Sequence, residues 1–217
     1  SLLALIVLSP VLLVLIIVGA IAMRGNPFFV QPRPGKKGKD GHEKIFYLIK
    51  LRSMSNKRGT NGELLPDDQR LGRYGAFLRS TSLDELPSLV NIVLGQLSIV
   101  GPRPFLVRDC VFLTDEQRRR HDVRPGLTGL AQVNGRNNIT WEQKFEYDLQ
   151  YIDKGITFLG DLKIIIQTVG KVLKRSDTVR EGTVSDMDYG DWLMMEGKVD
   201  QAAYDEKQKE ARELLNV

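Results

Sequence analysis

The opening segment of the chain, Leu2–Met23, constrains the fold most, because it is an almost unbroken run of apolar residues. As a straight helix rising about 1.5 Å per residue it would reach about 33 Å, and the hydrocarbon core of a bilayer is about 30 Å thick. Between Leu2 and Val18 the segment holds 14 Leu, Ile and Val residues, which favour insertion by about 4 to 8 kcal/mol. We therefore expect it to lie in a membrane.

Ser9 and Pro10 decide the shape of this segment. A proline deletes one backbone hydrogen bond and collides with the preceding turn, which costs about 3 kcal/mol or more. That is less than the gain from insertion, so the segment stays in the membrane but bends. It forms either a kinked span or a helix that returns to the side it entered from. Spans commonly tolerate proline, so physics alone favours the span.

Basic residues follow directly, which places this end of the segment on the cytoplasmic side and beside anionic headgroups; they are Arg24, Arg33, Lys36, Lys37 and Lys39. The whole chain has a formal net charge of +4 and a pI of about 9.1, which suits anionic partners. Its single cysteine, Cys110, excludes an internal disulfide, and two histidines exclude a His-rich zinc site.

The remaining sequence predicts an α/β fold that is mostly helical with little strand. A strand is expected over Glu43–Met54, where Lys50 and Arg52 share one face, either as site residues or as an ordinary solvated edge. Loops are expected over Gly25–Gly35 and Asn56–Gln69, and a short strand over Leu130–Val133. Helices are expected over Arg70–Leu78, Leu83–Leu94, Phe105–His121 with a break and cap near Thr114, Thr140–Ile152, Phe158–Lys174 and Ala202–Leu215.

The most informative stretch runs from Arg79 to Pro104. Asp84 and Glu85 are adjacent carboxylates at the start of an apolar run, and Glu85 lies three residues after Ser82, as in a capping box. Arg103 stands between two prolines in a stiff loop. The plain interpretation is a capped amphipathic helix followed by a turn. The alternative is an anion site at a helix N-terminus.

A second stretch, from Arg124 to Arg136, is rich in glycine and in hydrogen-bond donors. Glycines let the backbone approach an anion closely, and the donors are Arg124, Gln132, Asn134 and Arg136. Alone, this is a weak signal for a phosphate or sugar site, and Arg124 serves equally well as an anchor for its turn. Elsewhere, the run Gln117–Arg120 reads as a solvated face, and Asp148, Asp161 and Asp186 read as surface or capping carboxylates.

A membrane segment beside a basic domain suggests a substrate that is part lipid and part anion. If Asp84 attacked a nucleotide diphosphate, each pair of like charges about 4 Å apart would repel by about 4 kcal/mol at an effective dielectric near 20. The attack therefore needs at least two compensating cations, which a divalent metal with one or two arginines would supply. The product would be an aspartyl-phosphate type of intermediate. Candidate phosphate clamps are Lys50, Arg52, Arg79, Arg103, Arg124 and Arg136.

At this point the chain resembles a known family, the small monotopic phosphoglycosyl transferases of bacteria (PglC-like sugar transferases). The resemblance extends to about Arg180, and five motifs carry it in one order: Ser9–Pro10, Lys50–Met54, Leu78–Pro87, Ser98–Pro104, and Arg124–Gly129 with Gln132–Arg136. It implies an enzyme that moves a phospho-sugar from a UDP-sugar to a polyprenol phosphate, usually undecaprenyl phosphate, and releases UMP. It also implies a need for Mg²⁺.

The resemblance further implies residue roles. Asp84 matches the family's nucleophile and would also contact the metal, with Glu85 as its partner in proton or metal handling. Arg79 matches a phosphate-binding arginine and Arg136 one in the nucleotide-sugar pocket. Ser9–Pro10 matches the break that makes the membrane helix re-entrant, which reverses the preference for a span.

The expected organisation is a re-entrant membrane helix (1–23), a cytoplasmic catalytic domain with membrane-interface helices (24–180) and an amphipathic tail (181–217) that binds a partner or a second copy. We expect the bacterial inner membrane, at its cytoplasmic face, and no nucleic acid. The donor sugar and the pathway stay open. Two alternatives remain: a glycosyl transferase that moves only the sugar and releases UDP, and a membrane-anchored scaffold whose Asp84→Asn variant would lose nothing.

Overall fold

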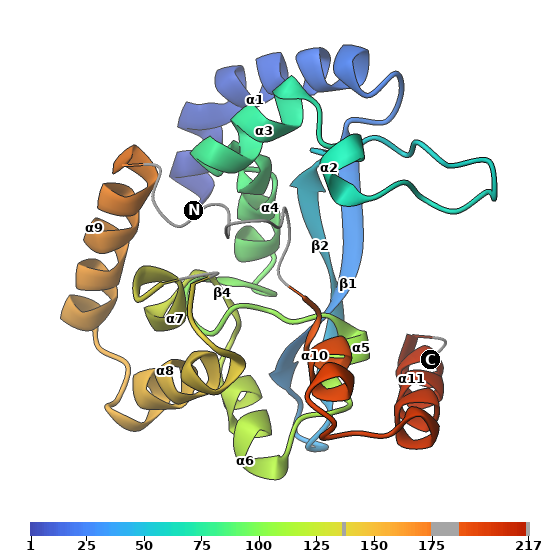
Figure 1. Ribbon diagram of the computed structural model, residues 1–217. Helices are drawn as coiled ribbons and strands as arrows, with labels where there is room; N and C mark the ends of the chain where they lie inside the picture. The colour runs from blue at the N-terminus through green and yellow to red at the C-terminus, as the bar shows by residue number, and fades with distance from the viewer. Residues whose placement is uncertain (136–137, 175–186, 216–217) are drawn as a thin grey trace.

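A computed structural model describes residues 1–135, 138–174 and 187–215 (Figure 1). These residues are mostly helical, as predicted, and contribute two small two-stranded sheets. The N-terminal helix α1 (Leu2–Ala22) lies along one edge of the molecule, and the C-terminal helices α10 (Tyr189–Met195) and α11 (Gln201–Leu215) lie at the opposite side from α9 (Phe158–Lys174).

Helix α1 is bent: in Figure 1 its first turns run in a different direction from the rest. Pro10 is the one proline inside it, and the Ser9 hydroxyl donates to the Ile6 carbonyl at 2.7 Å. Sharp bends in helices have their usual cause in proline. By length and composition α1 is sufficient to cross a membrane, and little of it is buried. Its second half packs on α3 (Arg73–Thr81), where the Tyr74 hydroxyl donates to the Leu15 carbonyl at 2.7 Å.

Strands β1 (Phe28–Lys37) and β2 (Glu43–Leu51) form a long antiparallel hairpin. The strand predicted near Glu43 is confirmed, but the loop predicted over Gly25–Gly35 is wrong. Its prolines, Pro32 and Pro34, favoured a loop because proline cannot donate to a ladder. A two-stranded sheet has only edges, and edge strands tolerate proline.

The stretch after α3 also differs from expectation. Ser82 adopts a left-handed conformation (φ 56°) and its side chain caps nothing, so the predicted capping box is absent. Asp84 and Glu85 lie in a 3₁₀ turn, η1 (Leu83–Glu85), and helix α4 (Ser88–Val93) begins only after Pro87. A short α2 (Asp67–Arg70) precedes α3 in an otherwise irregular loop.

Strands β3 (Ser98–Val100) and β4 (Gly126–Thr128) pair in parallel and bring the two motif regions together. Their backbones approach so closely that a Cβ on Gly126 would lie 2.1 Å from the Gly101 nitrogen. The glycines therefore serve close packing of strands. The strand predicted at Leu130–Val133 is wrong: those residues form helix α7, and the strand lies just before it.

The helices between Val107 and Lys174 follow the predictions more closely. Thr114 and Thr140 both cap with full capping boxes. The elements are α5 (Val107–Cys110), α6 (Asp115–Arg118), η2 (Arg119–Asp122), α8 (Trp141–Asp153) and α9.

A buried ion pair joins η2 to α8, where the sequence predicted solvated charges. Arg120 and Asp148 are 1% and 2% exposed, and the Arg120 Nη2 lies 2.6 Å from the Asp148 Oδ2. The same Nη2 donates to the Arg103 carbonyl at 2.7 Å, and the guanidinium lies 3.4 Å from the centre of the Phe105 ring. The pair thus fixes the backbone of the Arg103 loop.

Candidate active site

A cavity of about 780 Å³ opens between the β1–β2 hairpin, the 3₁₀ turn, the loop after β3 and the start of α8. Both adjacent carboxylates line it. So do four of the six predicted clamps, Lys50, Arg52, Arg79 and Arg103, together with the predicted donor Gln132.

Glu85 is already held by two cations. Its Oε1 accepts from Lys50 Nζ at 2.7 Å and from Arg103 Nη2 at 3.1 Å. Burial lowers the pKa of Lys50, with Arg103 adding to the effect and Glu85 opposing it. Glu85 in turn raises the pKa of Arg103. The carboxylate therefore favours the charged forms of both groups and holds them at the cavity wall.

Asp84 is half-buried, on the same turn, and lines the cavity. Arg79, at the end of α3, donates from Nε to the Ser53 hydroxyl at 3.1 Å. Burial lowers the pKa of Arg79, and the charge of Asp84 opposes that shift. The charge of Asp84 also acts on Lys50 and Arg103. Cationic side chains outnumber carboxylates at this end of the cavity, so an anion is attracted here.

Arg33 is a cavity residue that the sequence interpretation missed, since it was assigned to the headgroup cluster. It lies on β1, donates from Nη1 to the Pro104 carbonyl at 3.0 Å and from Nη2 to Gln31 Oε1 at 2.6 Å. Burial, reinforced by Arg103, lowers its pKa to about 10. A signal was present: Arg33 stands between two prolines, as Arg103 does.

Gln132, on α7, lies at a junction of two hollows. It lines the polar cavity and also an apolar groove of about 280 Å³, and the two hollows share Glu85 and Arg103 as well. Neither side-chain amide atom of Gln132 has a hydrogen-bond partner among the described residues, although both are buried. A buried amide without a partner is costly, so this side chain is suited to a ligand at the junction.

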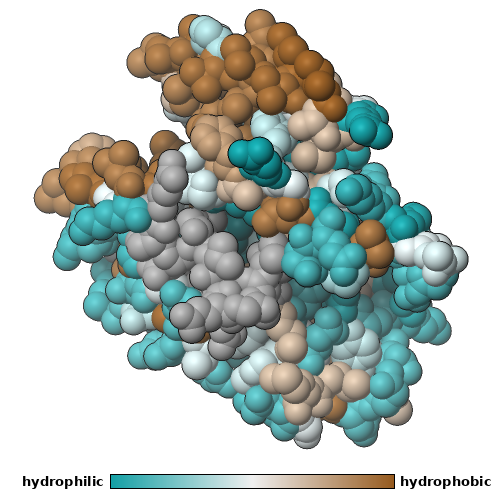
Figure 2. Space-filling view, turned by 45° about the horizontal axis from the view of Figure 1, so that its top comes forward, coloured by the Kyte–Doolittle hydropathy of each residue, from teal (hydrophilic) through white to brown (hydrophobic). Residues whose placement is uncertain are grey.

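The apolar groove runs between α1, α4 and α9. Its walls include Leu8, Leu89, Ile165 and Val169. The surfaces beside it are apolar too: Figure 2 shows one brown face over α1, at the top, and another over α9, at the left. On α9 the exposed apolar residues are Phe158, Leu159, Leu162, Ile166, Val169 and Leu173.

Three predicted site residues are not placed at the cavity. Arg124 is exposed near Gly95 and lines neither hollow. Asn134 is exposed, and its amide donates to the Leu130 carbonyl at 2.8 Å. Arg136 lies outside the described residues.

The residues at Asp84 fit a magnesium ion. Mg²⁺ binds proteins through one or two carboxylates and completes its shell with waters and substrate phosphates. Asp84 offers such a carboxylate beside the anion-attracting wall, whereas one oxygen of Glu85 is occupied by Lys50 and Arg103. Within the described part of the chain a second group, Glu43 with Cys110 and His121, brings ligand atoms together. There Glu43 is paired with Arg118 at 2.8 Å, which opposes a second cation.

Known protein sequences match most of the chain. A model of the family described as bacterial sugar transferase matches residues 1–175. The uncharacterized sugar transferase EpsL of Bacillus subtilis is 51% identical over 150 residues, which are 69% of this chain and 71% of that protein.

Two further relatives carry names that describe a function. The UDP-glucose:undecaprenyl-phosphate glucose-1-phosphate transferase of Klebsiella pneumoniae is 41% identical over 186 residues, covering 79% of this chain but 38% of that protein. The exopolysaccharide production protein ExoY of Sinorhizobium fredii is 34% identical over 185 residues, covering 79% of this chain and 81% of that protein.

Proposed function

Because the chain belongs to the bacterial sugar transferase family, we propose that it transfers a sugar phosphate from a UDP-sugar to undecaprenyl phosphate or a similar polyprenyl phosphate, with release of UMP. One observation carries the proposal: the polar cavity and the apolar groove share Glu85, Arg103 and Gln132. A diphosphate donor needs fixed cations and a lipid acceptor needs an apolar surface. Both are available at the point where the two hollows meet.

In the first step an oxygen of Asp84 attacks the donor phosphorus that carries the sugar. A bond forms between that oxygen and phosphorus, the bond from phosphorus to the bridging oxygen breaks, and UMP leaves with the electron pair. The attacking carboxylate and a donor with about two negative charges repel by about 4 kcal/mol for each pair at about 4 Å. Arg79, Lys50 and Arg103, whose charges already interact with Asp84, offset that repulsion.

In the second step an oxygen of the polyprenyl phosphate attacks the phospho-sugar on Asp84. The bond from phosphorus to the Asp84 oxygen breaks, which restores the carboxylate and leaves a polyprenyl diphosphate sugar. A phosphate monoester has a second pKa of about 6 and is largely a dianion at neutral pH, so it attacks without a general base. The prenyl chain lies in the apolar groove beside Leu8 and Val169.

This assigns Glu85 a positioning role. Its carboxylate is committed to Lys50 and Arg103, at 2.7 and 3.1 Å, and neither step requires it to take a proton. Asp84 is the residue that would hold Mg²⁺, which when bound supplies charge neutralisation at the donor phosphates.

We also place the protein at the cytoplasmic face of the bacterial inner membrane, with α1 entering and leaving on that side. Three features support this placement: the bend of α1, which contains Pro10, the exposed apolar surface of α1, and the apolar face of α9 beside it. A lipid acceptor could then reach the groove from the membrane.

The test is the nucleotide released by detergent-solubilised protein given Mg²⁺, undecaprenyl phosphate and a panel of UDP-sugars. We expect UMP from one or a few donors, with repeated turnover only when acceptor is present. UDP in place of UMP would contradict the proposal, because it would mean transfer of the sugar alone.

A further inference from the structure

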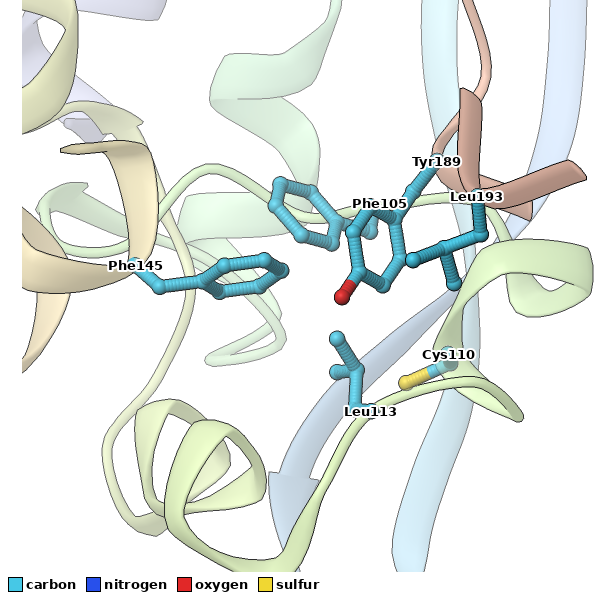
Figure 3. Close-up of a cluster of buried hydrophobic side chains, with 6 residues drawn as sticks. All are labelled: Phe105, Cys110, Leu113, Phe145, Tyr189 and Leu193. Atoms are coloured by element: carbon cyan, nitrogen blue, oxygen red, sulfur yellow. The ribbon is translucent and has the colours of Figure 1, made fainter. Parts of the chain in front are cut away.

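The C-terminal segment lies beyond the family match, which ends at residue 175, yet it packs on the catalytic domain. Helices α10 and α11 both contact α5, as Figure 1 shows. Tyr189 and Leu193 of α10 enter the largest aromatic cluster of the described chain, together with Phe105 and Phe145 (Figure 3). The Tyr189 ring centre lies 5.1 Å from that of Phe145 and 5.2 Å from that of Trp141.

Polar contacts also hold this segment, and because hydrogen bonds are directional they define its position more narrowly than apolar packing does. Arg108 donates from Nη2 to Asp191 at 2.8 Å and to the Tyr204 hydroxyl at 2.6 Å. The Gly190 N–H donates to Asp109 Oδ1 at 3.1 Å, and a Cβ on Gly190 would lie 2.6 Å from the Phe112 ring. Burial raises the pKa of Asp109 to about 7, as expected for a carboxyl that the docked segment shields from water.

This docking gives the C-terminal segment a place in the active site. Met187 and Asp188, the two residues directly before α10, line the same cavity as Asp84 and Glu85. Asp188 is oriented by Arg108, whose Nη1 lies 3.5 Å from its carboxylate. Trp141, which contacts α10, lines the cavity too.

Met187, Asp188 and Trp141 form one wall of the cavity, the C-terminal wall. Its chemistry differs from that of the end where Lys50, Arg79 and Arg103 lie. A carboxylate accepts hydrogen bonds and repels phosphate, and an aromatic face with a thioether packs on apolar C–H groups. A sugar ring presents both hydroxyl donors and C–H faces. Uracil presents two carbonyl acceptors against one N–H donor, so it fits a carboxylate less well. The ribose also carries hydroxyls, but UMP contains it as well, so UMP binding distinguishes the ribose from the donor sugar.

We propose that Met187 and Asp188, held in place by the docking of α10, contact the sugar ring of the donor and set which UDP-sugar is accepted. The inference rests on the proposed function, since it assumes a UDP-sugar in the cavity. It gives the C-terminal segment, which the family match does not cover, a direct part in substrate selection.

The chain carries its own probe for the test. Its two tryptophans, Trp141 and Trp192, both pack in the α10 cluster, so their fluorescence reports on this wall. The experiment measures the dissociation constants of UMP and of several UDP-sugars by tryptophan fluorescence, for wild type, Asp188→Asn and Met187→Ala. Glu206→Gln, an exposed residue of α11 that does not line the cavity, is the matched control for the change of charge.

We expect Asp188→Asn to change the ratio of dissociation constants between two UDP-sugars by about tenfold or more, as for one hydrogen bond to a charged group. The UMP constant should stay within about twofold, and the control variant should match wild type. An unchanged ratio in both Asp188→Asn and Met187→Ala would overturn the inference, as would an equal loss of UMP affinity, which would place the nucleotide at this wall.

The same proteins are assayed for UMP release with undecaprenyl phosphate, which separates the two claims. If wild type releases UMP and both variants keep the wild-type donor preference, the role of Met187 and Asp188 in selectivity is contradicted, but the proposed reaction is not. If the variants change donor preference as predicted but the product is UDP, the proposed reaction is contradicted and the role of Met187 and Asp188 in selectivity is supported.

Discussion

At the scale of single residues, the two adjacent carboxylates differ in what they already bind. Glu85 is the shared partner of Lys50 and Arg103 and is only 12% exposed, whereas Asp84 faces the cavity from the same short turn. The oxygen of Glu85 that accepts from both cations is committed to them. We therefore propose Asp84, which lines the cavity, as the nucleophile, and Glu85 as the residue that positions the cations for the donor.

This difference predicts the effect of Glu85→Gln. Removing its charge leaves Lys50 and Arg103 facing each other, so we expect a loss of about 1 to 3 kcal/mol in the free energy of unfolding and a fall in kcat of about 10²-fold or more, as the charge-stabilising groups lose their positions. Thermal or denaturant unfolding and steady-state kinetics measure the two effects.

The double variant Glu85→Gln with Lys50→Met is the control for that prediction. It removes one positive charge with the negative one, and we expect it to regain most of the lost stability but none of the lost activity. Wild-type kcat in Glu85→Gln alone would show that the two cations need no partner, and the positioning role would fall.

At the scale of elements, the bend of α1 determines where the groove opens. The groove is lined by Ala4 and Leu8, before Pro10, while residues after it, such as Leu15, pack on α3. The two halves of the helix thus have different surroundings: the first lines the apolar groove and the second packs on α3.

We therefore predict that Pro10→Ala changes the topology of α1. It restores one backbone hydrogen bond and removes a clash worth about 3 kcal/mol, which favours a straight helix that spans the bilayer. The test places a cysteine at the N-terminus with Ser1→Cys and adds a membrane-impermeant maleimide to the periplasmic side. With Pro10 present this cysteine should be shielded from the maleimide. With Pro10→Ala added it should be labelled. The native Cys110 is buried, and burial raises its pKa to about 12, so it does not interfere. Periplasmic labelling of Ser1→Cys in the parent would contradict the re-entrant topology.

The elements also show where sequence patterns suffice. Helices α8 and α9 were predicted within a residue or two, because their apolar spacing or caps are local signals. Strand β1 and helix α7 were assigned wrongly, because prolines and glycines report local conformational preference. In the folded chain β1 is governed by its pairing with β2 across the hairpin, and the residues before α7 by the close approach of Gly101 and Gly126.

At the scale of the whole molecule, the sequence predicted which residues could form a site better than it predicted their surroundings. Asp84, Glu85, Gln132 and four of the six predicted clamps line one cavity, and their motifs indicated a shared site. Arg33 and the Arg120–Asp148 pair were read as surface charges, because one-dimensional charge patterns do not reveal which side a strand or short helix turns inward. The position of Met187 and Asp188 at the cavity could not be predicted from the sequence for the same reason.

We propose that the sugar phosphate passes through Asp84. The most direct test is the intact mass of the protein after incubation with its UDP-sugar and Mg²⁺ in the absence of acceptor. We predict a mass increase of one sugar phosphate in the wild type, its disappearance when undecaprenyl phosphate is added, and no increase in Asp84→Asn, which should still bind the UDP-sugar. Full turnover to UMP by Asp84→Asn, or an adduct of the same mass on that variant, would contradict the account.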